Sequence, residues 1–252
     1  MNLHHSLVRR AAPVLLLAVL ASPALAQSPP DAEMHFTTGV SHLREGRVDL
    51  ALDEFKRAAK ADPKNPYFQK GLGQAYAAKG EWALAIAALR KALELNPYYV
   101  DTRNDLGYAL VMSGDREGGK KEFLTAFSDP MNPAPEISAY NLGRAYLEEK
   151  NYAEATNWLR TSVNRNKAYS LPYLLLAETL LATGRADDAI VQLEAGVREA
   201  PKDPDLLLAL GRAYLKVGKL AQARMRLDDA VKADPSGPVG RAAAEQLQTI
   251  AK

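Results

Sequence analysis

One short pattern of residues recurs along nearly the whole chain at an almost constant spacing. Six segments align when they start near residues 32, 66, 100, 136, 170 and 204, which gives spacings of 34, 34, 36, 34 and 34 residues. Periods in this range are typical of solenoids, in which each unit packs on its neighbours. The repeat therefore predicts a stack of similar units over 32–235 rather than a domain with one central core.

Small residues occupy three fixed places in every unit. The eighth, twentieth and twenty-seventh places hold only glycine, alanine or serine: Gly39, Gly73, Gly107, Gly143, Ala177 and Gly211; Ala51, Ala85, Gly119, Ala155, Ala189 and Ala223; and Ala58, Ala92, Ala126, Ser162, Gly196 and Ala230. Two helices approach closely only where neither carries bulk. We expect each unit to be a pair of antiparallel helices that cross at these places.

Large residues and turn residues complete the pattern. The twenty-fourth place is always large and apolar: Phe55, Leu89, Phe123, Leu159, Leu193 and Leu227. Glycine stands where a first helix must end, at Gly46, Gly80, Gly114, Gly184 and Gly218, and proline follows the second helix at Pro63, Pro97, Pro201 and Pro235. Glycine tolerates the left-handed conformation of such a turn, and proline stops a helix. Each unit therefore reads as helix, turn, helix.

This arrangement resembles the tetratricopeptide repeat, and the resemblance covers about residues 32–235. It implies an all-α fold, a right-handed superhelix of six helix-turn-helix repeats whose first helices line a concave groove. Residues 236–252 would form a helix that caps the last repeat.

The N-terminal residues have the pattern of an export signal. Arg9 and Arg10 precede a short apolar run, and Ala24-Leu25-Ala26 is an A-x-A cleavage site. The alternative, a retained anchor, is opposed by the shortness of the run, which is too short to span a bilayer. We expect residues 1–26 to be a Sec signal peptide, 27–31 to be a linker, and the mature protein to be soluble in a bacterial periplasm. Because the chain has no cysteine, it cannot be lipidated there on a cysteine.

Charge and composition limit the choice of partner. Cleavage after Ala26 removes two of the 32 basic residues and none of the 30 acidic ones. A net charge near zero gives no long-range attraction to phosphate backbones or anionic lipids. We therefore expect a protein or peptide partner, no nucleic acid, and no direct membrane insertion once the signal is removed.

The candidate binding residues are those expected on the inner face of the first helices. In the second to fourth units these are polar or tyrosine, and in the fifth and sixth units leucine: Tyr67, Lys70, Gln74, Asp101, Asn104, Tyr108, Tyr140, Asn141, Arg144, Leu171, Leu174, Leu175 and Leu208. Amides can bond an extended backbone, and exposed leucines usually meet a partner. The alternative for the leucines is packing against the next helix.

No catalytic pattern stands out, and no cofactor or metal is expected. His35 and His42 share a helical face, but two histidines without a neighbouring acidic ligand make a weak metal site, and both stand at packing places, so we expect them to pack as part of the first unit. An alternative is a hydrolase that uses a carboxylate pair drawn from Asp101, Asp105 and Glu148. A self-assembling structural protein is another alternative.

The junction of the third and fourth units departs from the period by two residues, at 129–135. We expect either a neutral loop variant or a joint between two halves, with Gly118 and Gly119 weakening the preceding helix. The junction also resembles the pilotin and pilus-stability proteins of type IV pilus systems, on Phe123-Leu124-Thr125-Ala126-Phe127, then Asp129-Pro130, then Tyr140-Asn141-Leu142-Gly143. That resemblance implies binding of an outer-membrane secretin subunit, although those proteins carry a lipidated cysteine. An adaptor for cell-wall or polysaccharide-synthesis complexes remains an alternative.

Overall fold

The structure, a computed structural model, describes residues 28–250 and consists there of helices and connecting turns, with no strand in that range. The helices are α1 (Pro30–Arg44), α2 (Val48–Ala61), α3 (Pro66–Ala78), α4 (Trp82–Leu95), α5 (Val100–Ser113), α6 (Arg116–Ser128), α7 (Pro135–Glu148), α8 (Tyr152–Arg165), α9 (Leu171–Ala182), α10 (Ala186–Glu199), α11 (Pro204–Lys216), α12 (Leu220–Ala233) and α13 (Pro238–Ile250). The expected signal peptide lies outside the described residues.

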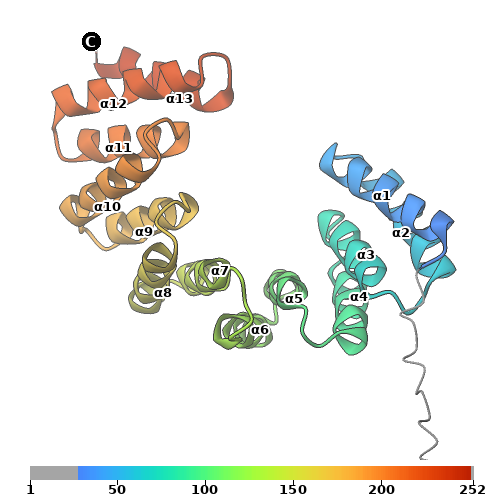
Figure 1. Cartoon of the computed structure of the whole chain (residues 1–252). Coiled ribbons are helices and arrows are strands. Elements are labelled where there is room, and N and C mark those ends of the chain that lie inside the picture. The colour runs from blue at the N-terminus through green and yellow to red at the C-terminus, as the bar shows by residue number, and fades with distance from the viewer. Residues whose placement is uncertain (1–27, 251–252) are drawn as a thin grey trace, which may run out of the picture.

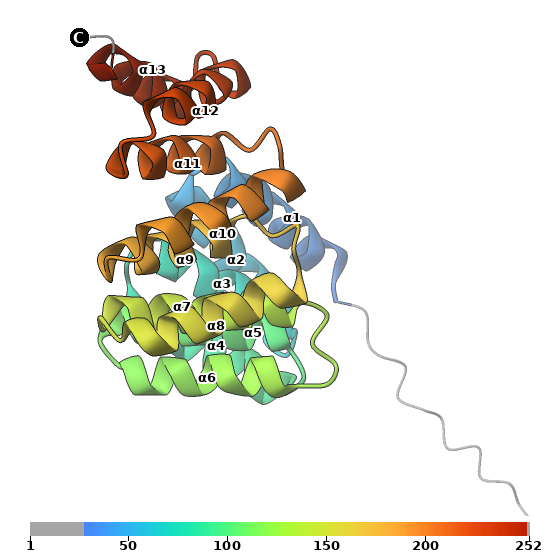
Figure 2. The ribbon, with the colours of Figure 1, turned by 90° about the vertical axis from the view of Figure 1, so that its left-hand side faces the viewer.

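The helices form consecutive hairpins that stack into a curved solenoid. Each helix packs on the next one along the chain, and each first helix also contacts the first helix of the following hairpin. Figure 1 shows the first helices, such as α3, α5 and α7, on the inner side of the curve, and Figure 2 shows the C-terminal hairpins stacked in layers up to α12 and α13. The prediction of an all-α solenoid of six hairpins with a final capping helix is confirmed.

The repeated small residues are the places where helices touch. All 18 of them are buried. A Cβ added at Gly107 would lie 2.6 Å from the Phe123 ring, and one at Gly143 would lie 2.6 Å from Leu159. The eighth place of a unit is therefore the hollow that receives the large residue at its twenty-fourth place. This fit fixes the distance between the two helices of a hairpin.

The hairpin turns use a left-handed residue after each first helix. Five of these residues are glycines, with φ from 72° at Gly46 to 100° at Gly114. In the fourth unit the position belongs to Lys150, with φ 57°, the single non-glycine residue at positive φ among those described. A left-handed conformation costs an L-residue with a Cβ about 1–2 kcal/mol. The fourth turn is therefore strained relative to the other five.

Replacing Lys150 by glycine should stabilise the protein. We expect Lys150→Gly to raise the free energy of unfolding by about 0.5–1 kcal/mol, because relief of the strained φ exceeds the extra entropy of an unfolded glycine. Urea denaturation followed by circular dichroism measures this. The matched reverse change, Gly184→Lys, should lower the free energy of unfolding; a loss of stability in both variants would contradict the account of the turn.

The junction of the third and fourth units is held by several contacts. Within the inserted loop, Asn132 donates from its side chain to the Ala126 carbonyl (2.7 Å) and accepts from the Ala134 N–H (2.9 Å). Lys120 of α6 is buried, and its ammonium lies 2.6 Å from Glu117 and 2.8 Å from Glu149 beyond the end of α7. Burial acts to lower the pKa of Lys120, but the bonds to these two carboxylates raise it, so this lysine stays charged.

Removing the charge of Lys120 should loosen this junction. We expect Lys120→Met to lower the free energy of unfolding by about 1 kcal/mol, because Glu149 then loses its partner while partly buried. Hydrogen exchange in α7 should also become faster. The adjacent exposed lysine gives the control, Lys121→Met, which should change neither quantity. If the two variants behave alike, the ion pair does not hold the junction.

Whether the loop acts as a joint stays a prediction. A joint requires hydrogen exchange across 115–135 to exceed that of the other segments between repeats. Equal rates would favour the neutral loop.

The C-terminal end is closed by α13, which packs on α12 and α11. Ala243 is buried there, and Leu247 and Ile250 pack against the large apolar cluster of the last two units. No helix within residues 28–250 has the length and apolar character needed to cross a membrane.

Candidate functional site

The inner face of α3, α5 and α7 carries the predicted polar residues. Lys70 and Asp101 form an ion pair across the gap between α3 and α5, with 3.7 Å between Nζ and Oδ2. One turn along, Gln74 donates from Nε2 to Asp105 Oδ2 at 2.8 Å. The fifth and ninth places of the second repeat are therefore bridged to the second and sixth places of the third.

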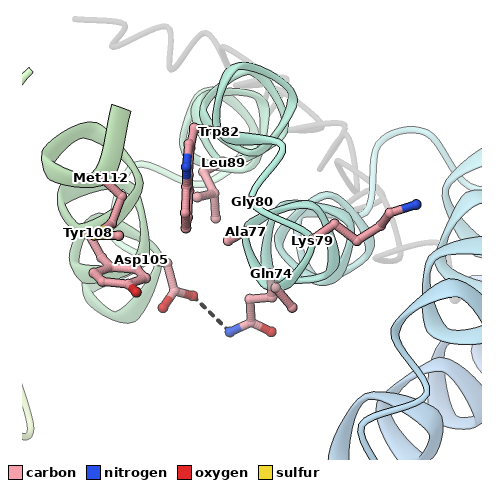
Figure 3. Close-up of a pocket in the computed structure, with 10 residues that line it drawn as sticks. Gln74, Ala77, Lys79, Gly80, Trp82, Leu89, Asp105, Tyr108 and Met112 are labelled. Carbon is pink, nitrogen blue, oxygen red and sulfur yellow. Dashed lines mark hydrogen bonds between the residues drawn. The ribbon is translucent and has the colours of Figure 1, made fainter. Parts of the chain in front are cut away.

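A hollow of 560 Å³ lies beside this second bridge. It is open to the groove and is bounded by α3, the start of α4, and α5: Gln74, Ala77, Ala78, Lys79, Gly80, Trp82, Leu89, Asp105, Tyr108 and Met112. We call it the Asp105 hollow. Figure 3 shows Tyr108 beside Asp105, the hydrogen bond from Gln74 to Asp105 next to them, and Trp82 apart from this bond, above it in the view.

Asp105 is the charged group of this hollow. Burial raises the pKa of its carboxyl above 3.8, although Lys70 and the hydrogen bond from Gln74 lower it in part. Lys79 also lines the hollow, but its ammonium bonds Asp49 at 2.8 Å and lies 3.4 Å from Glu81. Figure 3 shows the ammonium pointing away from Asp105. In residues 28–250, no lysine or arginine forms an ion pair with Asp105; Lys70, whose charge acts on Asp105, pairs with Asp101.

A second, smaller hollow of 200 Å³ lies at the N-terminal ends of α3 and α5. The rings of Tyr67 and Tyr99 meet there with centroids 4.9 Å apart. Burial, together with the neighbouring Tyr67 hydroxyl, raises the pKa of Tyr99 to about 12. Met131 and Pro133 of the inserted loop line the same hollow. The loop that breaks the repeat thus adds side chains to the groove region.

Aromatic and cationic groups continue onto α7. The Arg144 guanidinium lies 4.9 Å from the centre of the Tyr108 ring and 5.9 Å from that of Tyr140. Tyr140 in turn contacts Tyr169 at 5.5 Å between ring centroids. Asn141 of α7 and Asn104 of α5 are partly buried, and Asn104 has a side-chain oxygen without a hydrogen-bond partner among the described residues. Arg144 therefore links α7 to α5, as the Lys70–Asp101 and Gln74–Asp105 bridges link α5 to α3.

The predicted leucines of the last two units differ from one another in solvent exposure. Leu171 is exposed, at 46%. Leu174 and Leu175 are partly covered and pack against the C-terminal apolar cluster, and Leu208 is buried within it, at 7%. The expectation that Leu208 faces the groove is wrong, because α11 packs between α9 and α13 and the packing alternative holds there. Only Leu171 is fully available to a partner.

The structure also shows where the histidines weighed for a metal site and the carboxylates weighed for a hydrolase lie. The His35 ring nitrogen Nδ1 lies 2.6 Å from Glu54 of α2, an acidic neighbour that the spacing within α1 did not reveal. No group of three or more metal-binding side chains is found within the described part of the chain. Of the three carboxylates considered for a hydrolase, Asp101 pairs with Lys70 and Asp105 with Gln74, and Glu148 is exposed on α7.

Trp82 was missed as a groove residue. It stands at the first position of α4, and only first helices were expected to face the groove. It lines the Asp105 hollow together with Ala77, Ala78 and Gly80, packs against the apolar cluster of Ala85 and Leu89, and meets Tyr108 edge to face with ring centroids 6.0 Å apart. A bulky aromatic next to a run of small residues was the available signal.

Comparison with known proteins supports the repeat. A family model described as tetratricopeptide repeat matches residues 7–66 and 36–100, and a second with the same description matches 146–204 and 180–247. Together they cover well over half of the chain. Tetratricopeptide families are generally non-enzymatic and bind peptides or proteins.

Individual relatives agree in fold. A CTR9 homolog from Arabidopsis thaliana is 24% identical over 213 residues, which is 81% of this chain and 19% of that protein. The chain spans about a fifth to a third of the length of the first curated relatives it matches. The solved structure of PilW, described as a widely conserved type IV pilus biogenesis factor, superimposes with a TM-score of 0.69 at 20% identity, covering 89% of this chain and 100% of that one.

PilF of Pseudomonas aeruginosa gives a TM-score of 0.66 at 19% identity, covering 86% of this chain and 97% of that one. At such identities the likeness shows a shared fold. Repeat pattern, helical hairpins and family models agree, and the chain belongs to the tetratricopeptide repeat family.

Proposed function

We propose that the protein is a non-enzymatic periplasmic scaffold that holds a partner polypeptide in its concave groove. Side-chain contacts link α3, α5 and α7, which lie on the inner side of the curve (Figure 1), and these contacts carry this proposal. Gln74 and Asn141 have the donors and acceptors that an extended backbone requires, whereas the side-chain oxygen of Asn104 is buried. Leu171 would add apolar contact at the far end.

The partner that we propose is an outer-membrane secretin subunit of a type IV pilus system. Two observations support this choice: the sequence around the third junction, and a fold likeness to PilW that extends over the whole of that chain. Because the chain contains no cysteine, it would act unanchored or be held at the membrane by its partner.

Secretin assembly tests the pilus assignment. In the native bacterium, deletion of this gene should convert heat-stable secretin multimers into monomers, as seen on gels run without boiling. Expression of the full chain should restore the multimers. Unchanged multimers, with a defect in cell wall or exported polysaccharide instead, would contradict the pilus assignment and identify the adaptor alternative.

A further inference from the structure

The Asp105 hollow has the composition of a receptor for a cation. Its walls are the aromatic rings of Trp82 and Tyr108 and the thioether of Met112, and its charged group is one carboxylate that no basic side chain neutralises by contact in the described structure. A carboxylate has about four acceptor positions, and Gln74 uses one of them. Asp105 can therefore accept further hydrogen bonds from a ligand.

The basic groups near this hollow are engaged elsewhere. Lys79 bonds Asp49, Lys70 pairs with Asp101, and Arg144 stacks on Tyr108 without lining the hollow. Aromatic faces attract cations, and the attraction grows when water is excluded. Asp105 has no direct ion pair among the described residues, although Lys70 acts on it through space, and a cationic ligand would satisfy both this carboxylate and the adjacent rings.

We propose that the Asp105 hollow binds a lysine or arginine side chain of the partner polypeptide, with Asp105 accepting its N–H donors and Trp82 packing against its methylenes. This inference rests on the proposed function and specifies what the groove recognises. A volume of 560 Å³ holds one long side chain together with the backbone on either side of it.

The cost of Asp105 to the fold supports this role. Burial raises its pKa, so the ionised form is disfavoured in the folded protein. A carboxyl with a raised folded pKa contributes stability only at low pH, and that stability is lost as the pH rises through the raised value. Groups that reduce stability while facing a hollow are typical of binding sites.

Asp105→Asn should therefore raise the melting temperature at pH 7. Asparagine has the same shape and can still accept from Gln74, and it removes the ionised form that burial disfavours. The gain should shrink as the pH falls toward 3.8, where the aspartate is itself largely protonated. A lower melting temperature at pH 7 would show that Asp105 serves the fold rather than a ligand.

Binding can be tested with defined probes on the full mature chain. The probes are Nα-acetyl-arginine amide, Nα-acetyl-lysine amide, and the neutral isostere Nα-acetyl-citrulline amide, all at millimolar concentrations. The readout is the indole N–H signal in nitrogen-15 NMR. The chain has two tryptophans, Trp82 in the hollow and Trp158 on α8, so the second is an internal reference.

We expect the arginine and lysine probes to shift the Trp82 signal saturably, the citrulline probe to leave it unchanged, and Trp158 to stay fixed. Asp105→Asn should weaken binding at least about tenfold, as expected for loss of a charge-assisted bond. Asp53→Asn, the same change at an exposed site on α2, should have no effect. Equal responses to all three probes, equal shifts of both tryptophans, or full binding by Asp105→Asn would overturn the inference.

Failure of this inference can be separated from failure of the proposed function. If the groove captures a partner but Asp105→Asn binds it as tightly as the unchanged chain, then only the proposal that a basic side chain occupies the hollow is wrong. If a partner contacts the outer helices alone, the groove proposal itself fails, whatever the probes do.

Discussion

Replacing Phe123 by alanine should lower the free energy of unfolding by about 3–5 kcal/mol, the largest effect expected of any change considered for this chain. The ring is 1% exposed. It lies against Gly107 of α5, and it belongs to the apolar cluster of Val111, Leu142 and Ala145. Because that cluster spans α5, α6 and α7, the cavity would weaken both the third hairpin and its contact with the fourth.

Urea denaturation followed by circular dichroism at 222 nm measures this loss. The adjacent residue gives a matched control, since Leu124 is 46% exposed and Leu124→Ala should cost less than about 1 kcal/mol. Similar losses in the two variants would contradict the packing of the large residue at the twenty-fourth place against the small residue at the eighth.

Replacing Gly119 by alanine should destabilise the protein by about 2 kcal/mol, although alanine is the better helix former by about 1 kcal/mol. A Cβ at this position would lie 2.6 Å from the Gly107 carbonyl oxygen and 2.5 Å from Val111. One of these contacts is backbone, which cannot move aside without separating α5 from α6. Five other units carry alanine here, so the third hairpin is packed more closely than they are.

The neighbouring glycine provides the comparison. A Cβ at Gly118 would approach only the carboxylate of Asp115, a side chain that can rotate. We expect Gly118→Ala to be at least about 1 kcal/mol more stable than Gly119→Ala in the same denaturation experiment. If Gly119→Ala instead stabilises the chain, the two glycines serve to soften α6, as helix propensity alone would suggest.

The sequence was sufficient for the architecture because each packing contact is repeated six times. A single glycine opposite a single large residue does not predict a helix contact. The same pair at matching places of five units does, because it indicates that the hairpin has the same geometry in each of them. Turn glycines and helix-ending prolines then fix where each helix begins and ends. The capping helix followed from the need to cover the last apolar face.

The groove was harder to predict because its side chains depend on neighbours outside the unit. Leu208 is buried because α11 lies between α9 and α13, which the pattern within one repeat does not show. Trp82 lines the Asp105 hollow from a second helix, beside the small residues Ala77, Ala78 and Gly80. Lys150 occupies a glycine position, and His35 meets Glu54 from the next helix. Each of these departures reflects a contact between elements rather than a local preference.

The most direct test of the groove is a photo-crosslinking experiment in the native periplasm. A photoreactive phenylalanine analogue would replace either Met112, which is exposed on the inner side of α5, or Arg90, which is exposed on α4 away from the hollow. We expect Met112 to yield a crosslink to one defined polypeptide and Arg90 to yield none. A crosslink to that polypeptide from Arg90 with none from Met112 would contradict the account that the concave face holds the partner.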